Sequence, residues 1–321
     1  MKTRFHLVHN NDGWKLVLKQ NFDPNNIVKG RRPVVIIPGY GMNAFIFGYH
    51  PTGLSMEEYI VSQGFEVWSV NLRNQGDAIR VDGGSNYTIG DISLIDLPHA
   101  FDYIIENNET GADLIDGIGC SLGGTYLCVY AALCDDPKLG SLVSMGGPLK
   151  WVEVHPALKF AMSSPWLLGL IPLCGTRAFA KIAFPMIANY APSLLKIYMH
   201  PEIVDISKSA DLVQTVEDPN RFLNREIAIW VKNKDLYVKG QNVTEKLKRF
   251  VSPIMCMVAN ADGIVPEKTV TSALEASGSK NKKTIYCGNE SIKLAHADMF
   301  ISDYAHEMVF KPLCEWLKSQ Y

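Results

Sequence analysis

Short apolar runs alternate with longer amphipathic segments through the first half of the chain. The runs lie at 33–37, 65–70, 112–118 and 141–145. Unbroken runs rich in β-branched residues are typical of parallel strands that are buried on both faces. The segments at 54–63, 91–106 and 125–133 are helix-like. Strands that alternate with helices predict an α/β fold, with a mostly parallel central sheet and helices on both faces.

The two ends of the chain extend this pattern. At the start, residues 5–8 and 14–18 flank the turn Asn11-Asp12-Gly13, which predicts an antiparallel hairpin. Towards the other end, strands are predicted at 253–258 and 283–287, followed by a closing helix at 308–318.

The alternation of strands and helices stops at Pro148 and resumes near residue 253. Between these points the chain is helix-like and punctuated by proline, with helices predicted at 151–170, 179–187, 192–198 and 244–250. Ligands bind at the carboxyl edge of open α/β sheets, so we predict a helical cap inserted over this edge. The chain then divides into a first part of the core at 1–147, the cap insertion at 148–250 and a second part of the core at 251–321.

The sequence Gly119-Cys120-Ser121-Leu122-Gly123 joins a predicted strand to a predicted helix. The pattern G-x-S-x-G at such a junction predicts a nucleophile elbow, a sharp turn that exposes the serine hydroxyl. Gly119 and Gly123 lie two residues from Ser121, where side chains would obstruct the strained turn. The hydroxyl would lie near the N-terminus of the helix, where unpaired amides, including that of Leu122, favour developing negative charge. We therefore predict that Ser121 is a nucleophile.

A serine hydroxyl needs a base to take its proton and an acid to orient that base. Asp262 lies in a polar turn after the strand predicted at 253–258, and His296 follows the last predicted strand. The chain order serine, aspartate, histidine is the order that this architecture uses for acyl transfer. We predict that Ser121, Asp262 and His296 form a catalytic triad.

Other residues near these positions offer alternatives. Asp298 follows the histidine by two residues and Glu153 follows the preceding strand, so either could replace Asp262, although Asp298 is better placed to support the loop. His306 is an alternative base, but it precedes the last helix instead of following a strand. Cys120 lies one residue before the serine and is expected to point into the protein.

The chain resembles the α/β-hydrolase superfamily over nearly its whole length, because four landmarks of that superfamily occur in the usual order. They are the segment Pro38-Gly39-Tyr40-Gly41 after the first buried strand, the elbow, the Asp262 turn and the His296 loop. The resemblance implies that Ser121 is the nucleophile, that His296 is general base and then acid, and that Asp262 holds the imidazole. It also implies an oxyanion hole formed by the backbone amides of Tyr40 and Leu122. The reaction requires no metal or organic cofactor.

Two segments depart from the common pattern of the superfamily. Residues 38–41 lie where the superfamily usually has His-Gly. The backbone amide of Tyr40 stays available there, but different side chains pack behind it. The loop at 71–76 has asparagine where aspartate and glycine are usual, and its Arg73 is expected to be structural. The runs 59–71 and 123–125 are similar to acid-lipase-like hydrolases and also to polyhydroxyalkanoate synthases. Those synthases carry cysteine where this chain has Ser121, so hydrolysis is favoured over polymer synthesis.

Composition and charge exclude several other classes of protein. The formal net charge is -2 and the basic residues are spread along the chain, so we expect no nucleic-acid partner. Seven cysteines form no C-x-x-C pair and lie mostly in apolar segments, which is typical of reduced thiols in an intracellular protein. The first residues lack the apolar run of a secretory signal. We therefore expect a cytoplasmic protein.

One stretch of the predicted cap, at 160–176, contains no charged residue. Its prolines and glycines argue against a membrane span, which needs about twenty apolar residues. Ordinary packing of the cap against the sheet would explain the composition. We also expect that its apolar side chains line an acyl pocket or transiently touch a lipid surface. These residues are Trp166, Leu167, Leu168, Leu170 and Ile171.

Together these features predict a serine hydrolase that cleaves a carboxylic ester with a hydrophobic acyl or alcohol part through an acyl-enzyme. The same nucleophile could serve a thioesterase, or an acyltransferase in which a dry cap excludes water. A further hypothesis is a non-catalytic relative whose cap binds a lipid or a protein. Dehalogenase and epoxide-hydrolase chemistry is disfavoured, because both require a carboxylate at position 121.

Overall fold

A central sheet organises the computed structural model, which describes residues 1–170 and 174–321, and the side chains of these except Ala157, Ala161, Leu167 and Leu170. Its strands are β1 (Lys2–His9), β2 (Trp14–Phe22), β3 (Val34–Ile37), β4 (Val67–Asn71), β5 (Ile79–Arg80), β6 (Ile115–Cys120), β7 (Leu139–Met145), β10 (Ile254–Ala259) and β11 (Lys282–Cys287). They are arranged in the order β1-β2-β4-β3-β6-β7-β10-β11, and the short β5 pairs with β2.

The sheet is mostly parallel, as the sequence predicts. The hairpin of β1 and β2 is antiparallel and pairs antiparallel with β4. From β4 through β3, β6, β7 and β10 to β11, every neighbouring pair is parallel. All residues of β3, β6 and β10 are buried, because helices cover both faces of the sheet.

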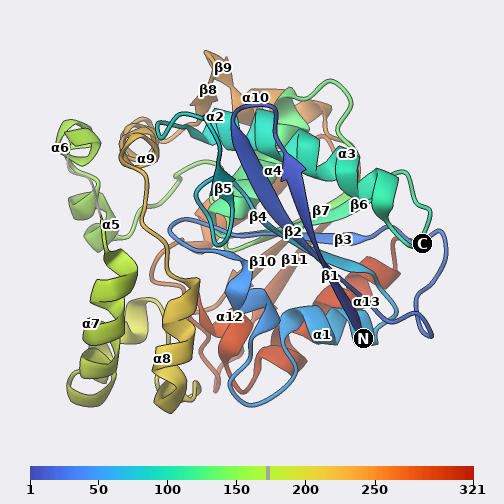
Figure 1. The fold of residues 1–321 in the computed structure, drawn as a ribbon. Helices are drawn as coiled ribbons and strands as arrows, with labels where there is room; N and C mark the ends of the chain where they lie inside the picture. The colour runs from blue at the N-terminus through green and yellow to red at the C-terminus, as the bar shows by residue number, and fades with distance from the viewer. Residues whose placement is uncertain (171–173) are drawn as a thin grey trace.

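Two helical layers enclose the sheet (Figure 1). One layer consists of α1 (Met56–Ser62), α12 (Asp298–Ile301) and α13 (Lys311–Lys318). The other consists of α2 (Ile89–Asp91), α3 (Leu97–Asn107), α4 (Leu122–Leu133), α10 (Val243–Lys246) and α11 (Glu267–Ala276). Two separate apolar cores result, one on each face of the sheet. This arrangement confirms the fold class expected from the alternating pattern.

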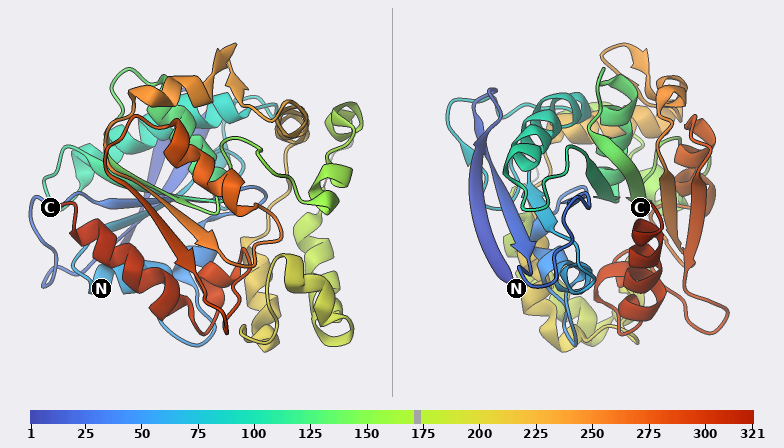
Figure 2. Two further views of the ribbon diagram at one scale, coloured as in Figure 1. Left: turned by 180° about the vertical axis from the view of Figure 1, so that it is seen from behind. Right: turned by 90° about the vertical axis from the view of Figure 1, so that its right-hand side faces the viewer.

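Between β7 and β10 the chain forms a mainly helical segment. Its helices are α5 (Pro156–Ala161), α6 (Pro165–Leu170), α7 (Thr176–Tyr190), α8 (Ser209–Leu212) and α9 (Arg221–Asn233), and a small hairpin pairs β8 (Tyr237–Val238) with β9 (Gln241–Asn242). Helices α5 to α9 lie together beyond one end of the sheet, as the left view in Figure 2 also shows. We refer to α5–α9 as the cap helices. The domain limits at 148 and 250 stay a prediction. Residues 236–250 pack on α4 in one of the two apolar cores.

Two features of this segment differ from the sequence prediction. The single helix predicted over 151–170 is wrong, because α5 ends before Pro165 and α6 begins there. Proline lacks an amide hydrogen and disfavours helical backbone in the residue before it, which separates the two helices. Helix α9 was not predicted. Its signals are the helix-capping Asn220 and apolar side chains at helical spacing, which are Leu223, Ile227, Trp230 and Val231.

Within the part of the chain that the structure describes, no helix has both the length and the apolar character needed to cross a bilayer.

Candidate active site

Ser121 occupies a strained turn between β6 and α4. Its φ of 53° and ψ of -124° lie in a region that residues other than glycine rarely adopt. A Cβ atom on Gly119 would lie 2.4 Å from the carbonyl group of Gly123. A Cβ atom on Gly123 would lie 2.3 Å from the carbonyl oxygen of Ile37 in β3. Neither position can hold a side chain, so both glycines are required for this turn.

The backbone around the serine provides candidate amides for an oxyanion. Leu122 is the first residue of α4, and the first amides of a helix have no acceptor within it. The loop after β3 packs closely against this point. A Cβ atom on Gly39 would lie 2.8 Å from Cβ of Ser121 and 3.2 Å from the Leu122 nitrogen. The peptide between Gly39 and Tyr40 therefore lies beside the elbow.

The Tyr40 side chain joins this loop to the cap helices. Its hydroxyl donates a hydrogen bond of 2.6 Å to Oδ1 of Asn224 in α9. Burial, with a smaller contribution from Tyr87, raises the pKa of Tyr40 to about 12, so the phenol is neutral. The sequence interpretation considered only the amide of Tyr40 and missed this link, because the helix that carries Asn224 was not predicted.

His296 and Asp262 form a buried pair. Nδ1 of His296 lies 2.6 Å from Oδ2 of Asp262. The other carboxylate oxygen, Oδ1, accepts hydrogen bonds from the amides of Ile264 and Val265 at 2.8 and 2.9 Å. Burial alone would lower the pKa of His296, but the charge of Asp262 and its hydrogen bond outweigh burial and raise that pKa. Because Nδ1 is the nitrogen that bonds to Asp262, Nε2 of His296 is the one suited to accept a proton.

Ser121 and His296 line one cavity. Gly146 after β7 lies close to the imidazole, because a Cβ atom there would be 2.9 Å from Cε1 of His296. No hydrogen bond joins Oγ of Ser121 to Nε2 of His296 among those formed by the described residues. In unliganded active sites such bonds are often long and tighten when substrate binds.

The alternative residues have other partners. Asp298 accepts hydrogen bonds from the amide of Ala295 at 2.7 Å and from Nδ1 of His200 at 2.8 Å, so it supports the loop before His296. Glu153 forms an ion pair of 2.6 Å with Lys268 at the surface. Nε2 of His306 is 2.8 Å from the carbonyl oxygen of Leu54. Asp262 is therefore the described carboxylate that holds His296.

Two more residues singled out in the sequence have structural surroundings. Arg73 is buried and its guanidinium forms hydrogen bonds to both Asp96 and Asp12. Cys120 is fully buried, and burial raises the pKa of its thiol well above the ordinary value. A thiol held in this protonated form is a poor nucleophile.

The cavity at Ser121 has a volume of about 270 Å³ and a mostly apolar wall. It is lined by Tyr40, Met42, Ser121, Leu122, Pro148, Trp151, Leu158, Met162, Tyr198, Ile227, Trp230, Ile264, Val265 and His296. The rings of Trp151 and Trp230 meet edge to face at 5.5 Å. A hydrophobic group bound here would therefore contact aromatic and aliphatic side chains next to the candidate nucleophile.

The structure describes only some of the residues that the sequence predicts for the pocket. Trp166 in α6 is 70% exposed and is not among the residues that line this cavity. Ile171 lies outside the described residues, and the roles of Leu167 and Leu170 stay predictions. The sequence interpretation missed Trp151, Tyr198 and Trp230 as lining residues. They come from three separate segments, and no local pattern connects these segments.

Comparison with known proteins agrees with this architecture. The family model described as alpha/beta hydrolase fold matches residues 32–173. A monoacylglycerol lipase from Paleococcus ferrophilus is similar in structure, with a TM-score of 0.64, 17% identity, and coverage of 95% of this chain and 99% of that chain. A bromoperoxidase from Bacillus anthracis has a TM-score of 0.66, 15% identity and coverages of 98% and 100%. An esterase from Thermogutta terrifontis has a TM-score of 0.60, 14% identity and coverages of 100% and 99%.

The chain therefore has the α/β-hydrolase fold. No protein with a curated description matches the sequence.

Proposed function

We propose that this protein is a serine hydrolase that cleaves a carboxylic ester with a hydrophobic acyl or alcohol part. The observation that carries the proposal is the 2.6 Å pair of His296 and Asp262 at an apolar cavity lined by Ser121. A monoacylglycerol lipase and an esterase share the fold, which supports ester chemistry over other reactions. The fold alone does not define a reaction, so the proposal depends on these side chains.

In the proposed cycle, Nε2 of His296 takes the proton of Ser121 as Oγ attacks the ester carbonyl carbon. The amides of Tyr40 and Leu122 donate hydrogen bonds to the resulting oxyanion. The imidazolium, stabilised by Asp262, then gives its proton to the leaving alcohol, and an acyl-enzyme remains. Water activated by His296 hydrolyses the acyl-enzyme, which restores the serine hydroxyl and releases the carboxylic acid.

A substrate panel with one shared acyl group tests this proposal. We expect turnover of the ester with a burst of released alcohol in the first seconds, because an acyl-enzyme accumulates when its hydrolysis is slow. Preferred turnover of the matched thioester would indicate a thioesterase. An ester product formed with an added alcohol would indicate an acyltransferase. Failure of every ester, thioester and amide to react would contradict the proposal.

The pH dependence of kcat/KM should report the His296–Asp262 pair. The neutral imidazole is the active base, so kcat/KM should rise with pH and level off above the pKa of His296. Asp262 raises that pKa, so the midpoint should lie above the ordinary histidine value of about 6.5. In Asp262→Asn, burial remains while the charge is lost, so the midpoint should move to lower pH. An unchanged midpoint in this variant would mean that Asp262 does not act on the group whose titration is measured.

We also propose that the cap helices touch an anionic lipid surface. One face of α7 carries four apolar side chains at helical spacing, each more than half exposed. They are Phe179, Ile182, Met186 and Tyr190. Residues 154–201 contain four lysine or arginine residues and no aspartate or glutamate. Arg177 pairs with Glu217 and Lys196 pairs with Glu202, so Lys159 and Lys181 are the two without an ion pair to a described residue. Apolar side chains flanked by positive charge are the combination that favours anionic membranes.

Sedimentation with lipid vesicles tests this contact. We expect stronger binding to vesicles that contain phosphatidylglycerol than to pure phosphatidylcholine, because the adjoining charge is positive. Ile182→Asp should reduce this binding at least about tenfold, since it places a charge on the contacting face. Val251→Asp is the matched control, because Val251 is equally apolar and exposed but lies outside the cap helices. Equal binding by both variants, or no preference for the anionic lipid, would refute the contact.

All seven cysteines are free. This supports the proposal that the protein works in a reducing compartment such as the cytoplasm.

A further inference from the structure

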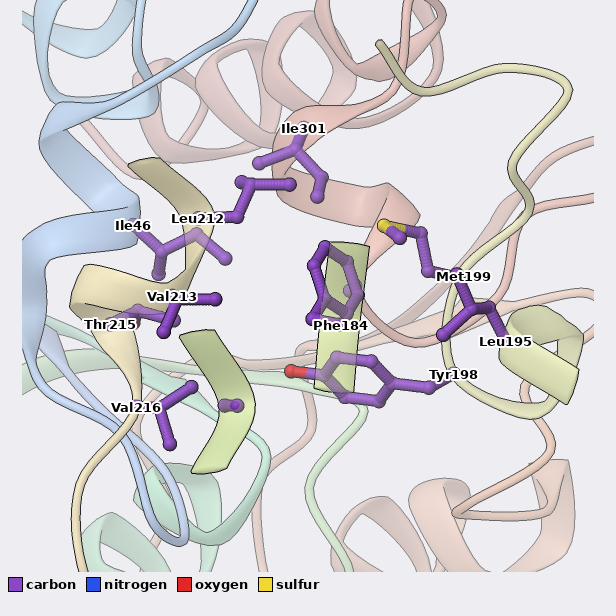
Figure 3. A pocket seen from close by; sticks show the side chains of 12 residues that line it. Ile46, Phe184, Leu195, Tyr198, Met199, Leu212, Val213, Thr215, Val216 and Ile301 are labelled. Atoms are coloured by element: carbon purple, nitrogen blue, oxygen red, sulfur yellow. The ribbon is translucent and has the colours of Figure 1, made fainter. Parts of the chain in front are cut away.

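A second apolar cavity, of about 190 Å³, lies between α7 and the core (Figure 3). Side chains from several segments line it, among them Ile46, Phe184, Leu195, Leu212 and Ile301. Its wall holds two hydroxyl groups. That of Thr215 already donates to the carbonyl oxygen of Asn43 at 3.2 Å, and the other belongs to Tyr198. Apolar cavities of roughly 150 Å³ stay dry and accept small apolar molecules, so the wall suits a hydrocarbon.

This cavity adjoins the one that contains Ser121. Tyr198 lines both cavities. His296 lines the first cavity, and its neighbour in the chain, Ala297, lines the second. Met42 lines the first and Val216 lines the second, and these two residues pair in an isolated β-bridge. The second cavity is therefore one residue along the chain from the candidate base, and a β-bridge joins the walls of the two cavities at a second point.

The Tyr198 side chain lies at the boundary between the two cavities. Its ring is 5.9 Å from the imidazole of His296. Figure 3 shows its hydroxyl directed in among the side chains of the second cavity, on the side of Val213 and Val216. No described residue forms a hydrogen bond with this hydroxyl, and 43% of the residue's surface is accessible. Movement of the ring would break no polar contact with a described residue.

We propose that the second cavity binds the distal end of a substrate's hydrocarbon chain and that Tyr198 determines which chain lengths reach it. The inference rests on the proposed function, because it places the reacting ester at Ser121. A short chain would end in the first cavity. A long chain would pass the ring of Tyr198 and gain the contacts of the second cavity. The two volumes together fall within the range of roughly 300–1,000 Å³ that is usual for small-molecule sites.

Filling the second cavity tests this proposal. Ala180 in α7 lines it, so Ala180→Phe should occupy the space that the chain end would take. Burial of one methylene group changes binding roughly fourfold, so two or more excluded methylenes should have a large effect. We expect the ratio of kcat/KM for a twelve-carbon ester to that for a four-carbon ester to fall at least about tenfold. Ala178→Phe is the matched control, because Ala178 is exposed in the same helix and should leave the ratio unchanged.

Two substrate series identify the chain that enters. One series varies the acyl chain of p-nitrophenyl esters, and the other varies the alkyl chain of acetate esters. If Ala180→Phe loses the long-chain preference in only one series, the second cavity binds the chain that this series varies, acyl or alkyl. Tyr198→Ala removes the boundary and should raise the ratio at least about threefold in the same series. An unchanged ratio in both series for both variants, with wild-type melting temperatures, would refute the inference while the proposed function stands.

A binding measurement separates this inference from the proposed function. If the wild type hydrolyses no ester, calorimetry with dodecanoate and butanoate still tests the cavity. Dodecanoate should bind more tightly than butanoate, and Ala180→Phe should weaken dodecanoate binding at least about tenfold. Ala178→Phe should leave it unchanged. Equal affinity of all three proteins for dodecanoate, or no binding at all, would refute the chain site, while the substrate panel alone decides the hydrolase.

Discussion

Ser121→Ala is expected to lower kcat for the best ester about a millionfold, the scale of loss when the nucleophile of a serine triad is removed. The oxygen that would bond to the acyl carbon is lost, while the cavity and the His296–Asp262 pair remain. KM should change much less than kcat, because the apolar wall still binds substrate. Alanine also fits the small space at the elbow, so the melting temperature should stay near that of the wild type.

A fluorophosphonate probe gives an independent measurement of the same prediction. It should label the wild type and leave Ser121→Ala unlabelled. Cys120→Ala is the matched control, because Cys120 is the adjacent residue and its thiol is buried and protonated. That variant should still be labelled. Labelling that persists in Ser121→Ala, or disappears in Cys120→Ala while the protein stays folded, would reject the assigned nucleophile.

Asp262→Asn is expected to lower kcat about 10⁴-fold, as for the equivalent change in other serine triads. The carboxylate accepts the hydrogen of Nδ1 on His296 and stabilises the imidazolium that forms in the reaction. An asparagine amide would favour the wrong tautomer of the histidine and would supply no charge. The buried position of both side chains strengthens this dependence, since charges interact more strongly away from bulk solvent.

Two control variants test whether Asp262, and neither Glu153 nor Asp298, is the acid of the triad. Glu153→Gln changes a surface residue paired with Lys268 and should alter kcat less than twofold, in line with the small contribution of surface ion pairs. Asp298→Asn should lower the melting temperature, because Asp298 supports the loop through His200 and Ala295. Its effect on kcat should stay far below that of Asp262→Asn. If kcat falls more in Asp298→Asn than in Asp262→Asn, the roles assigned to the two aspartates are reversed.

The sheet could be predicted from the sequence because each buried strand is an unbroken apolar run of its own. The run at 33–37 became β3, and the run at 141–145 became part of β7. The elbow could also be predicted, because the two glycines around Ser121 are needed by backbone contacts within the turn itself. These features depend on residues that are close together in the chain.

The pocket could not be predicted, because its wall depends on the packing of distant segments. Trp230 lines it from α9, whose apolar residues are spaced among charged ones and give no continuous run. Trp166 is apolar and lies in an uncharged stretch, yet it points outward from α6. Composition alone does not distinguish an inner from an outer position on a helix when both faces are apolar. The packing of α9 and of the segments that carry Trp151 and Tyr198 decides which aromatic rings line the cavity at Ser121.

The hydrogen bond between Tyr40 and Asn224 limits how freely the protein could be re-engineered. The elbow depends on contacts made by β3, β6 and α4, and these would persist if α5, α6 or α7 were exchanged for segments from a relative. Replacement of α9 is different, because Asn224 accepts the hydrogen bond that holds the loop of one candidate oxyanion amide. A chimera that imports a new α9 therefore has to retain an acceptor at this position, or it will alter reactivity together with substrate range.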